Sequence, residues 1–148
     1  MKNIKPLDNS ENKKKQITDM FDNIAGTYDL LNLILSFSMD YIWRKKAIKL
    51  INNNPKKILD IATGTADFAI MAAKYTKAKI IGIDISKKML NVGNEKIKKH
   101  KLSNRISLKL ADAEKLPFKN NSFKAITCVY VVIVLCAVFF NDFRLCGP

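Results

Sequence analysis

The 148-residue chain is poor in the side chains that most often hold metal ions or perform covalent catalysis. Its one histidine, His100, follows a lysine-rich segment and is interpreted as a solvated side chain. The three cysteines, Cys128, Cys136 and Cys146, have neither metal-binding nor redox spacing. We therefore expect no metal site and no nucleophile–base pair, and a reduced, cytoplasmic chain is the simplest interpretation.

Acidic residues and arginine are also scarce. The chain has 13 acidic residues against 26 basic ones, for a net charge of +13, yet its only arginines are Arg44, Arg105 and Arg144. Arginine is preferred for two-point recognition of phosphates and bases, and no nucleic-acid-binding signature occurs. We expect no specific nucleic acid partner. A basic RNA- or membrane-associated binding protein is the alternative from another functional class, and the charge is compatible with peripheral contact with anionic lipid at the inner membrane face.

The common phosphate-binding motifs are missing as well. There is no Gly-Lys-Ser/Thr and no three-glycine dinucleotide pattern, which disfavours ATP and dinucleotides. What the chain does have is a short apolar run, a turn of small residues containing Gly64, and an apolar, helix-prone segment over 68–77. In such a strand–turn–helix unit, backbone N–H groups at the helix start can approach a ligand closely.

The sequence predicts four strands, at 58–62, 78–83, 106–110 and from 125 to about 132. Three of them end near an acid: Asp60, Asp84 and Asp112. Asp84 lies twenty residues beyond Gly64, the distance at which a carboxylate can bind both hydroxyls of a ribose. The three acids fit an adenosine with a positively charged tail, with Asp60 near the tail, Asp84 on the ribose and Asp112 on the adenine amine.

This combination resembles the class I S-adenosylmethionine-dependent methyltransferases over residues 58–132. The resemblance implies an α/β, Rossmann-like sheet with the first strand central and the fourth beside it, and S-adenosyl-L-methionine as cofactor. It also implies that Thr65 shapes the methionine end of the cofactor site and that the Ala113 backbone N–H lies near adenine.

The segment before the first strand narrows the resemblance. Tyr28-Asp29, Asn32, Leu35-Ser36, Asp40 and Trp43 keep the spacing of a signature that is similar to that of the ubiquinone/menaquinone biosynthesis C-methyltransferases. The resemblance implies methyl transfer to a ring carbon of demethylmenaquinol or a ubiquinol precursor, which is a prenylated quinol. It identifies no catalytic base, and the choice of quinone and the oligomeric state stay open.

Residues 17–54 are expected to form a helical lid over the cofactor. Phe21, Ile24, Ala25, Tyr28, Leu31 and Leu35 have the spacing of one apolar helical stripe. Asp40 is expected to cap a second helix that carries Trp43, Ala47, Leu50 and Ile51 on one face. Core packing explains Phe21 and Trp43 as well as substrate contact does, whereas Tyr28 and Asn32 are the candidates for polar contacts to the quinol ring.

The C-terminal sequence departs from the resemblance. Members of this class have seven strands, whereas only about four are predicted within 55–130, and the family pattern ends between Cys128 and Val132. We therefore expect a truncated or frameshifted copy, and an inactive fragment with at most residual cofactor binding is the alternative to an active enzyme. Residues 131–148 would be an apolar tail outside the family frame, with a short membrane segment as its rival interpretation. Residues 1–16 are expected to be a disordered basic arm without a signal peptide.

Overall fold

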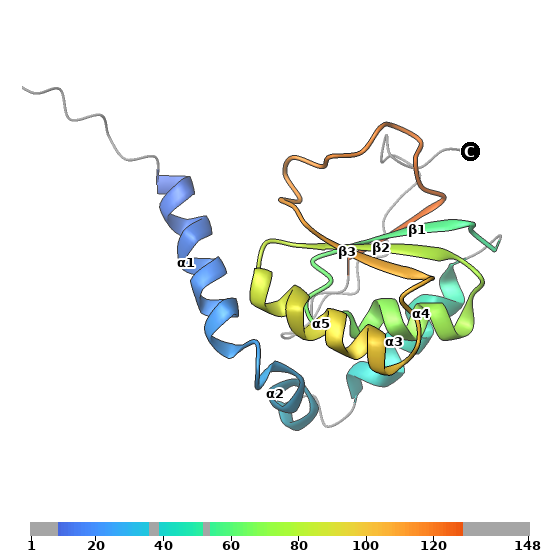
Figure 1. Cartoon of the computed structure of the whole chain (residues 1–148), viewed down its shortest axis with the longest axis horizontal. Helices are drawn as coiled ribbons and strands as arrows, with labels where there is room; N and C mark the ends of the chain where they lie inside the picture. The colour runs from blue at the N-terminus through green and yellow to red at the C-terminus, as the bar shows by residue number, and fades with distance from the viewer. Residues whose placement is uncertain (1–8, 36–38, 52–53, 129–148) are drawn as a thin grey trace, which may run out of the picture.

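The computed structural model describes residues 9–35, 39–51 and 54–128, and the described part is built on a four-stranded parallel sheet (Figure 1). The strands are β1 (Lys57–Ile61), β2 (Lys79–Asp84), β3 (Ile106–Leu110) and β4 (Ala125–Cys128). Their order is β3-β2-β1-β4. Each begins within one residue of its predicted start, and β4 pairs with β1 as the resemblance implied.

Five helices lie within the described ranges. Three precede the sheet: α1 (Asn9–Ile24), α2 (Tyr28–Leu35) and α3 (Met39–Leu50). The other two connect its strands: α4 (Asp67–Tyr75) follows β1, and α5 (Lys87–Lys99) follows β2. None of them is long and apolar enough to cross a membrane.

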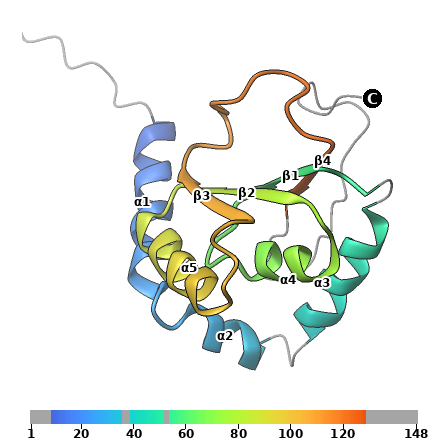
Figure 2. The same cartoon turned by 45° about the vertical axis from the view of Figure 1, so that its right-hand side comes forward.

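The two faces of the sheet are covered differently. Helices α3, α4 and α5 lie on one side of it, and the segment 111–124 arches over the other (Figures 1 and 2). Because neighbouring parallel strands pair Ile58 with Ile80 and Ile80 with Ile106, these residues share the helical face. The opposite face buries Leu59 and Ile83 against Phe123. Both faces are therefore apolar, which explains the nearly continuous hydrophobic runs of β1 and β2.

The N-terminal region differs from its expectation in two ways. Residues 9–16, expected to be disordered, form the first half of α1, whereas residues 1–8 lie outside the described part. The expected single stripe from Phe21 to Leu35 is divided between α1 and α2, because the chain turns at Ala25–Thr27. Gly26 lies in this turn, and the loss of helix propensity at glycine accounts for the break.

The predicted faces of α3 were also partly wrong. The helix begins at Met39, so Asp40 lies inside its first turn rather than before it. Trp43 and Leu50 are exposed, whereas Arg44, Ala47 and Ile48 are buried. The difference arises because Arg44 turns toward the sheet to reach an acid on α4. The predicted continuation of β4 to residue 132 and the tail 131–148 lie outside the described residues.

One close contact in the sheet gives a first prediction. Gly82 of β2 pairs with Asp60, and a Cβ there would lie 2.7 Å from Leu108 Cδ2 and 2.8 Å from Thr63 Oγ1. We expect Gly82→Ala to lower the free energy of unfolding by about 1–3 kcal/mol through overpacking. Urea denaturation measures this, with Gly26→Ala as the matched control because nothing lies within 4 Å of its added Cβ. Equal stability of the two variants would contradict the packing argument.

Candidate functional site

A pocket of about 410 Å³ lies at the carboxyl ends of β1, β2 and β3. The strand ends and the loops after them form one wall, and α1 forms the other. The lining residues are Lys14, Lys15, Ile17, Thr18, Phe21, Tyr28, Ala62, Gly64, Ile83, Asp84, Ile85, Met89, Ala111, Asp112, Ala113 and Glu114. Four residues singled out from the sequence for cofactor binding, Gly64, Asp84, Asp112 and Ala113, are thus brought together.

Asp84 is fixed by two backbone hydrogen bonds. The N–H of Gly64 donates to Oδ2 at 2.8 Å, and the N–H of Ser86 donates to Oδ1 at 2.9 Å. Each carboxylate oxygen keeps a second acceptor site, and Asp84 borders the pocket. The twenty-residue spacing seen in the sequence therefore corresponds to a direct contact between the turn and the end of β2.

The turn between β1 and α4 has an unusual backbone. Gly64 has φ of +55° and Ala66 has φ of +65°, both in the left-handed region. Ala66 is the N-cap of α4 and offers no side-chain cap to the helix. This conformation brings the Gly64 backbone to the pocket wall without a side chain in between.

Asp112 closes the far side of the pocket together with α1. Its Oδ1 accepts from the Glu114 N–H at 2.9 Å, and its Oδ2 accepts from Lys14 Nζ at 2.9 Å. Lys14 also contacts the Glu114 carboxylate. The hydrogen bond from Lys14 lowers the pKa of Asp112 below its usual value, and the two carboxylates raise that of Lys14. Asp112 therefore faces the pocket as a carboxylate that is already paired with the Lys14 ammonium group.

Helix α1 is attached at two points. Lys14 holds its first half to the loop after β3, and Asp22 accepts hydrogen bonds from Ser86 Oγ and from the Lys88 N–H near its end. Ile17 and Phe21 lie between these attachments and line the pocket. Helix α1 overlaps the start of the segment 17–54 that was expected to be a lid, begins at Asn9, and forms one wall of the pocket.

Sequence reasoning missed the pocket residues of α1 before position 17. Lys14 and Lys15 were assigned to a disordered arm. The spacing of Ile17, Phe21 and Ile24 is helical and could have extended the helix toward the N-terminus. No sequence pattern pairs Lys14 with Asp112, which lies 98 positions away.

Asp60 and Thr65 do not line the pocket at the strand ends. Asp60 is buried at 1% exposure and accepts hydrogen bonds from Thr63 Oγ1 at 2.6 Å and Thr127 Oγ1 at 2.8 Å. Both residues border a separate cavity of about 30 Å³, which is large enough for a single water. Burial raises the pKa of Asp60 to about 6, against the hydrogen bonds and the nearby Arg44 charge, which lower it.

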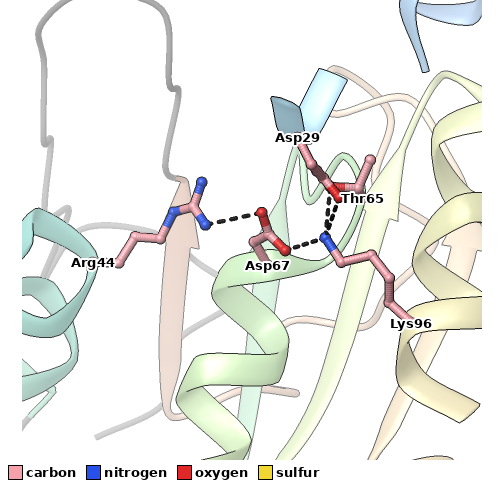
Figure 3. A network of polar contacts seen from close by, with 5 residues as sticks. All are labelled: Asp29, Arg44, Thr65, Asp67 and Lys96. Carbon is pink, nitrogen blue, oxygen red and sulfur yellow. Dashed lines mark hydrogen bonds and ion pairs between the residues drawn. The ribbon is translucent and has the colours of Figure 1, made fainter. Parts of the chain in front are cut away.

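A polar network next to this cavity joins four helices and the turn (Figure 3). Asp67 of α4 binds Arg44 of α3 at 3.1 Å and contacts Lys96 of α5. Lys96 also binds Asp29 of α2 at 2.7 Å, and Asp29 Oδ1 accepts from Thr65 Oγ1 at 2.5 Å. The Thr65 hydroxyl is therefore bonded to α2, and Thr65 borders the small cavity rather than the pocket at the strand ends. Its expected role at the methionine end of the cofactor site stays a prediction.

The two candidates for quinol contact are placed differently. Tyr28 lines both cavities and meets Phe21 edge to face, with 6.3 Å between ring centroids. Asn32 is buried at 5% exposure and does not border the pocket at the strand ends. Its Nδ2 has no hydrogen-bond partner among the described residues. Those residues also include no group of three or more side chains suited to a metal ion.

The fold and the pocket define a Rossmann-like α/β domain with a ligand site at the strand carboxyl ends. Solved structures agree with this fold. The [4+2]-cyclase SpnF matches with a TM-score of 0.65 at 20% identity, over 76% of this chain and 47% of SpnF. The YcgJ protein of Bacillus subtilis matches with a TM-score of 0.55 at 28% identity, over 59% of this chain and 37% of its own.

Sequence comparison is more specific. The model of the ubiE/COQ5 methyltransferase family matches residues 9–135, so the chain belongs to that family. It is 47% identical over 129 residues to the demethylmenaquinone methyltransferase of Bacteroides fragilis, covering 86% of this chain and 53% of the relative. The ubiquinone/menaquinone biosynthesis C-methyltransferase UbiE of Geobacter sulfurreducens is 37% identical over 80% of this chain and 47% of its own. The chain thus spans about half the length of the curated relatives it matches.

The buried carboxyl of Asp60 gives a prediction on pH dependence. Its pKa rises from 3.8 to about 6 on folding, so the folded state holds the proton more tightly than the unfolded state. Stability should therefore fall as pH rises between these two values and level off above the upper one, by about 3 kcal/mol in total at about 1.4 kcal/mol per pKa unit. Asp60→Asn should remove this slope, because the threonine hydroxyls can donate or accept.

Urea denaturation across this pH range measures the effect. Asp19→Asn is the matched control, because Asp19 is exposed and loses the same charge. A slope that persists in Asp60→Asn, or that disappears equally in Asp19→Asn, would show that Asp60 does not titrate on folding in this range.

Proposed function

We propose that this chain binds S-adenosyl-L-methionine in the pocket at the strand ends and belongs to an enzyme that methylates a ring carbon of demethylmenaquinol or a related prenylated quinol. The observation that carries the proposal is the convergence of Gly64, Asp84 and Asp112 on one pocket. Membership of the ubiE/COQ5 family and the names of the relatives support the reaction and the substrate class.

The residues of the pocket fit the cofactor. Its volume of about 410 Å³ falls within the range of small-molecule sites. Asp84 has acceptor positions to spare for two ribose hydroxyls, and Asp112 together with the Ala113 backbone can recognise an adenine edge. Apolar side chains such as Ile83, Ile85 and Met89 offer flat contact area for the base. When bound, the cofactor supplies an electrophilic methyl group on a sulfonium ion.

The residues of this chain would act by positioning the cofactor and the quinol substrate. The turn at Gly64 would let the ligand approach the backbone, and α1, which lines the pocket, would limit the access of water to a bound ligand. Tyr28 stands at the pocket wall, where its hydroxyl is the candidate to orient the quinol ring. Asn32, with a buried Nδ2 that lacks a described partner, is a second candidate for such a contact. Asp60 would support the turn from below through Thr63.

Cofactor binding without methyl transfer is the second candidate function. It is favoured by the finding that the chain spans about half the length of relatives whose names describe the reaction. Titration of the chain with S-adenosyl-L-methionine and a methyl-transfer assay on demethylmenaquinol separate the two: binding with turnover supports the first, and binding without turnover supports the second. Absence of binding contradicts both.

Asp84→Asn tests the ribose contact. The substitution keeps the shape of the side chain but removes the charge and one acceptor, so the amide oxygen can accept from only one of the Gly64 and Ser86 N–H groups. Because a hydrogen bond to a charged group is worth about 1.5–3 kcal/mol, we expect calorimetry to show a loss of S-adenosyl-L-methionine affinity of about tenfold or more. Asp112→Asn should cost less, because one adenine contact is lost. Unchanged affinity in both variants, with unchanged melting, would place the cofactor elsewhere.

Lys14→Gln tests the lid. Lys14 occupies the carboxylate that the adenine amine would need, so removing its charge should raise S-adenosyl-L-methionine affinity by roughly two- to fivefold, the scale of an exposed ion pair. The wild-type affinity should rise with salt for the same reason, since salt screens the Lys14–Asp112 pair. Lys13→Gln is the control, because Lys13 is exposed and does not line the pocket. A loss of affinity in Lys14→Gln would mean that the ammonium group contacts the ligand directly.

A further inference from the structure

Helix α2 is built with its polar side inward. Asn32 is buried and Asp29 binds Lys96 and Thr65, so the two polar residues of its middle face the body of the protein. Its large apolar side chains are exposed instead, by 40–59% of their surface: Leu30, Leu31, Leu33 and Ile34. Exposure of an apolar helix face to water is unfavourable. An exposed apolar face of this kind therefore marks a site of contact with a partner.

Helix α3 extends the same surface. Tyr41, Ile42 and Trp43 are 47–50% exposed. Leu33 of α2 and Tyr41 and Ile42 of α3 line one broad, shallow depression, whose floor includes Tyr75 of α4. Both helices lie below the sheet in Figures 1 and 2, away from the segment 111–124. We define the α2–α3 apolar surface as seven of the exposed apolar residues of the two helices: Leu30, Leu31, Leu33, Ile34, Tyr41, Ile42 and Trp43.

The charges next to this surface are positive. Lys46 lies over the Trp43 ring at 4.8 Å, and Lys45 lies over the Tyr75 ring at 5.8 Å. Lys49 is exposed on the same helix, and Lys74 borders the depression. From Tyr41 to Leu50, α3 carries no acidic residue.

Two acids beside the depression are already paired with other residues. Asp29 and Asp67 line the depression, but Lys96 binds both of them and Arg44 also binds Asp67. Within the described part of the chain, Lys45, Lys46, Lys49 and Lys74 form no ion pair with an acid.

This chemistry distinguishes between occupants of the surface. Exposed leucine and isoleucine beside tryptophan, tyrosine and lysine is the combination found where helices lie in the headgroup region of a bilayer. A second copy of the chain would fit less well, because a two-fold contact would bring the same lysines of both copies together. Anionic lipid instead supplies the negative charge that the lysines lack.

We propose that the α2–α3 apolar surface docks on an anionic phospholipid bilayer, with the apolar side chains at headgroup depth and the lysines on the lipid phosphates. The proposal does not rest on the proposed function. If both hold, docking places the helices that carry Tyr28 next to the phase in which a prenylated quinol dissolves.

The chain contains a reporter for this contact. Trp43 is its only tryptophan and lies within the surface. Mixing the protein with vesicles of phosphatidylglycerol and phosphatidylcholine in equal parts should shift the emission of Trp43 to shorter wavelengths. Lipids that are brominated on their acyl chains should quench the Trp43 emission, and the protein should sediment with the vesicles. Vesicles of phosphatidylcholine alone should give a much smaller response.

Three variants that retain Trp43 separate the contributions. Leu33→Gln with Ile42→Gln removes apolar contact, and a triple glutamine variant of Lys45, Lys46 and Lys49 removes charge. Each should raise the lipid concentration at half-binding by about tenfold or more. The matched control is a triple glutamine variant of Lys115, Lys119 and Lys124, which are exposed in or next to the segment 111–124 and remove the same charge. It should bind within about twofold of the wild type if docking is local. Circular dichroism confirms that all variants fold.

Several results would overturn the proposal. An equal loss in both lysine variants would show general attraction of a cationic protein rather than docking. Sedimentation with vesicles while the Trp43 emission stays unchanged would assign binding to another part of the chain, such as the uncharged run 125–141. Protection of Trp43 from iodide in the absence of lipid, at concentrations where the protein self-associates, would make a second copy the occupant.

Discussion

The arrangement of the helices depends on the ion pairs that the Asp67 carboxylate forms. This carboxylate stands at the start of α4 and binds a cation from each side, Arg44 from α3 and Lys96 from α5. Lys96 then reaches Asp29, which fixes α2. Arg44 is almost fully buried, so loss of Asp67 would remove an ion pair from a buried charge, which is costly. The same carboxylate thus decides where Tyr28 stands beside the pocket and why α2 turns its leucines outward.

The sheet and the edge at which the pocket lies were predicted well from the sequence, because the signals for them lie within short stretches of the chain. Strand residues repeat with period two or form short apolar runs, and parallel strands must end at one edge, so acids after β2 and β3 had to converge. The twenty-residue link between Gly64 and Asp84 could be predicted because it belongs to one strand–helix–strand unit.

The N-terminal helices were harder to predict, because periodicity identifies an apolar face but not what covers it. The stripe through Leu31 suggested burial, whereas Asp29 and Asn32 take the inner side of α2. What decides this is the pairing of Asp29 with Lys96, which is 67 positions away and has no local signal. The pairing of Lys14 with Asp112 escaped prediction for the same reason. Asp60 was placed correctly on a strand, but its bonds to Thr63 and Thr127 were not foreseen, because Thr127 is 67 positions away.

The fold does not by itself decide the chemistry of the pocket. SpnF, whose structure matches this chain, is a [4+2]-cyclase, whereas the sequence relatives are named as methyltransferases. The same fold therefore occurs with different reactions, and the family is identified by sequence spread over residues 9–135.

Leu108 joins two glycines into one packing unit. Its Cδ2 lies 2.7 Å from where a Cβ would stand at Gly82, and its Cδ1 lies 2.8 Å from that position at Gly93 on α5. The Leu108 side chain therefore sets the distance between α5 and the strands β2 and β3. It thereby also sets the position of Lys96, which lies on α5 and binds Asp29 and Asp67. Changes at these three positions should be strongly epistatic: a smaller residue 108 removes the closest contact of an alanine at either glycine, although Thr63 still lies 2.8 Å from the Cβ position at Gly82. A smaller residue 108 alone leaves a void until a glycine has been replaced. The effect of a substitution at Gly82, Gly93 or Leu108 therefore depends on which of the three residues changes first.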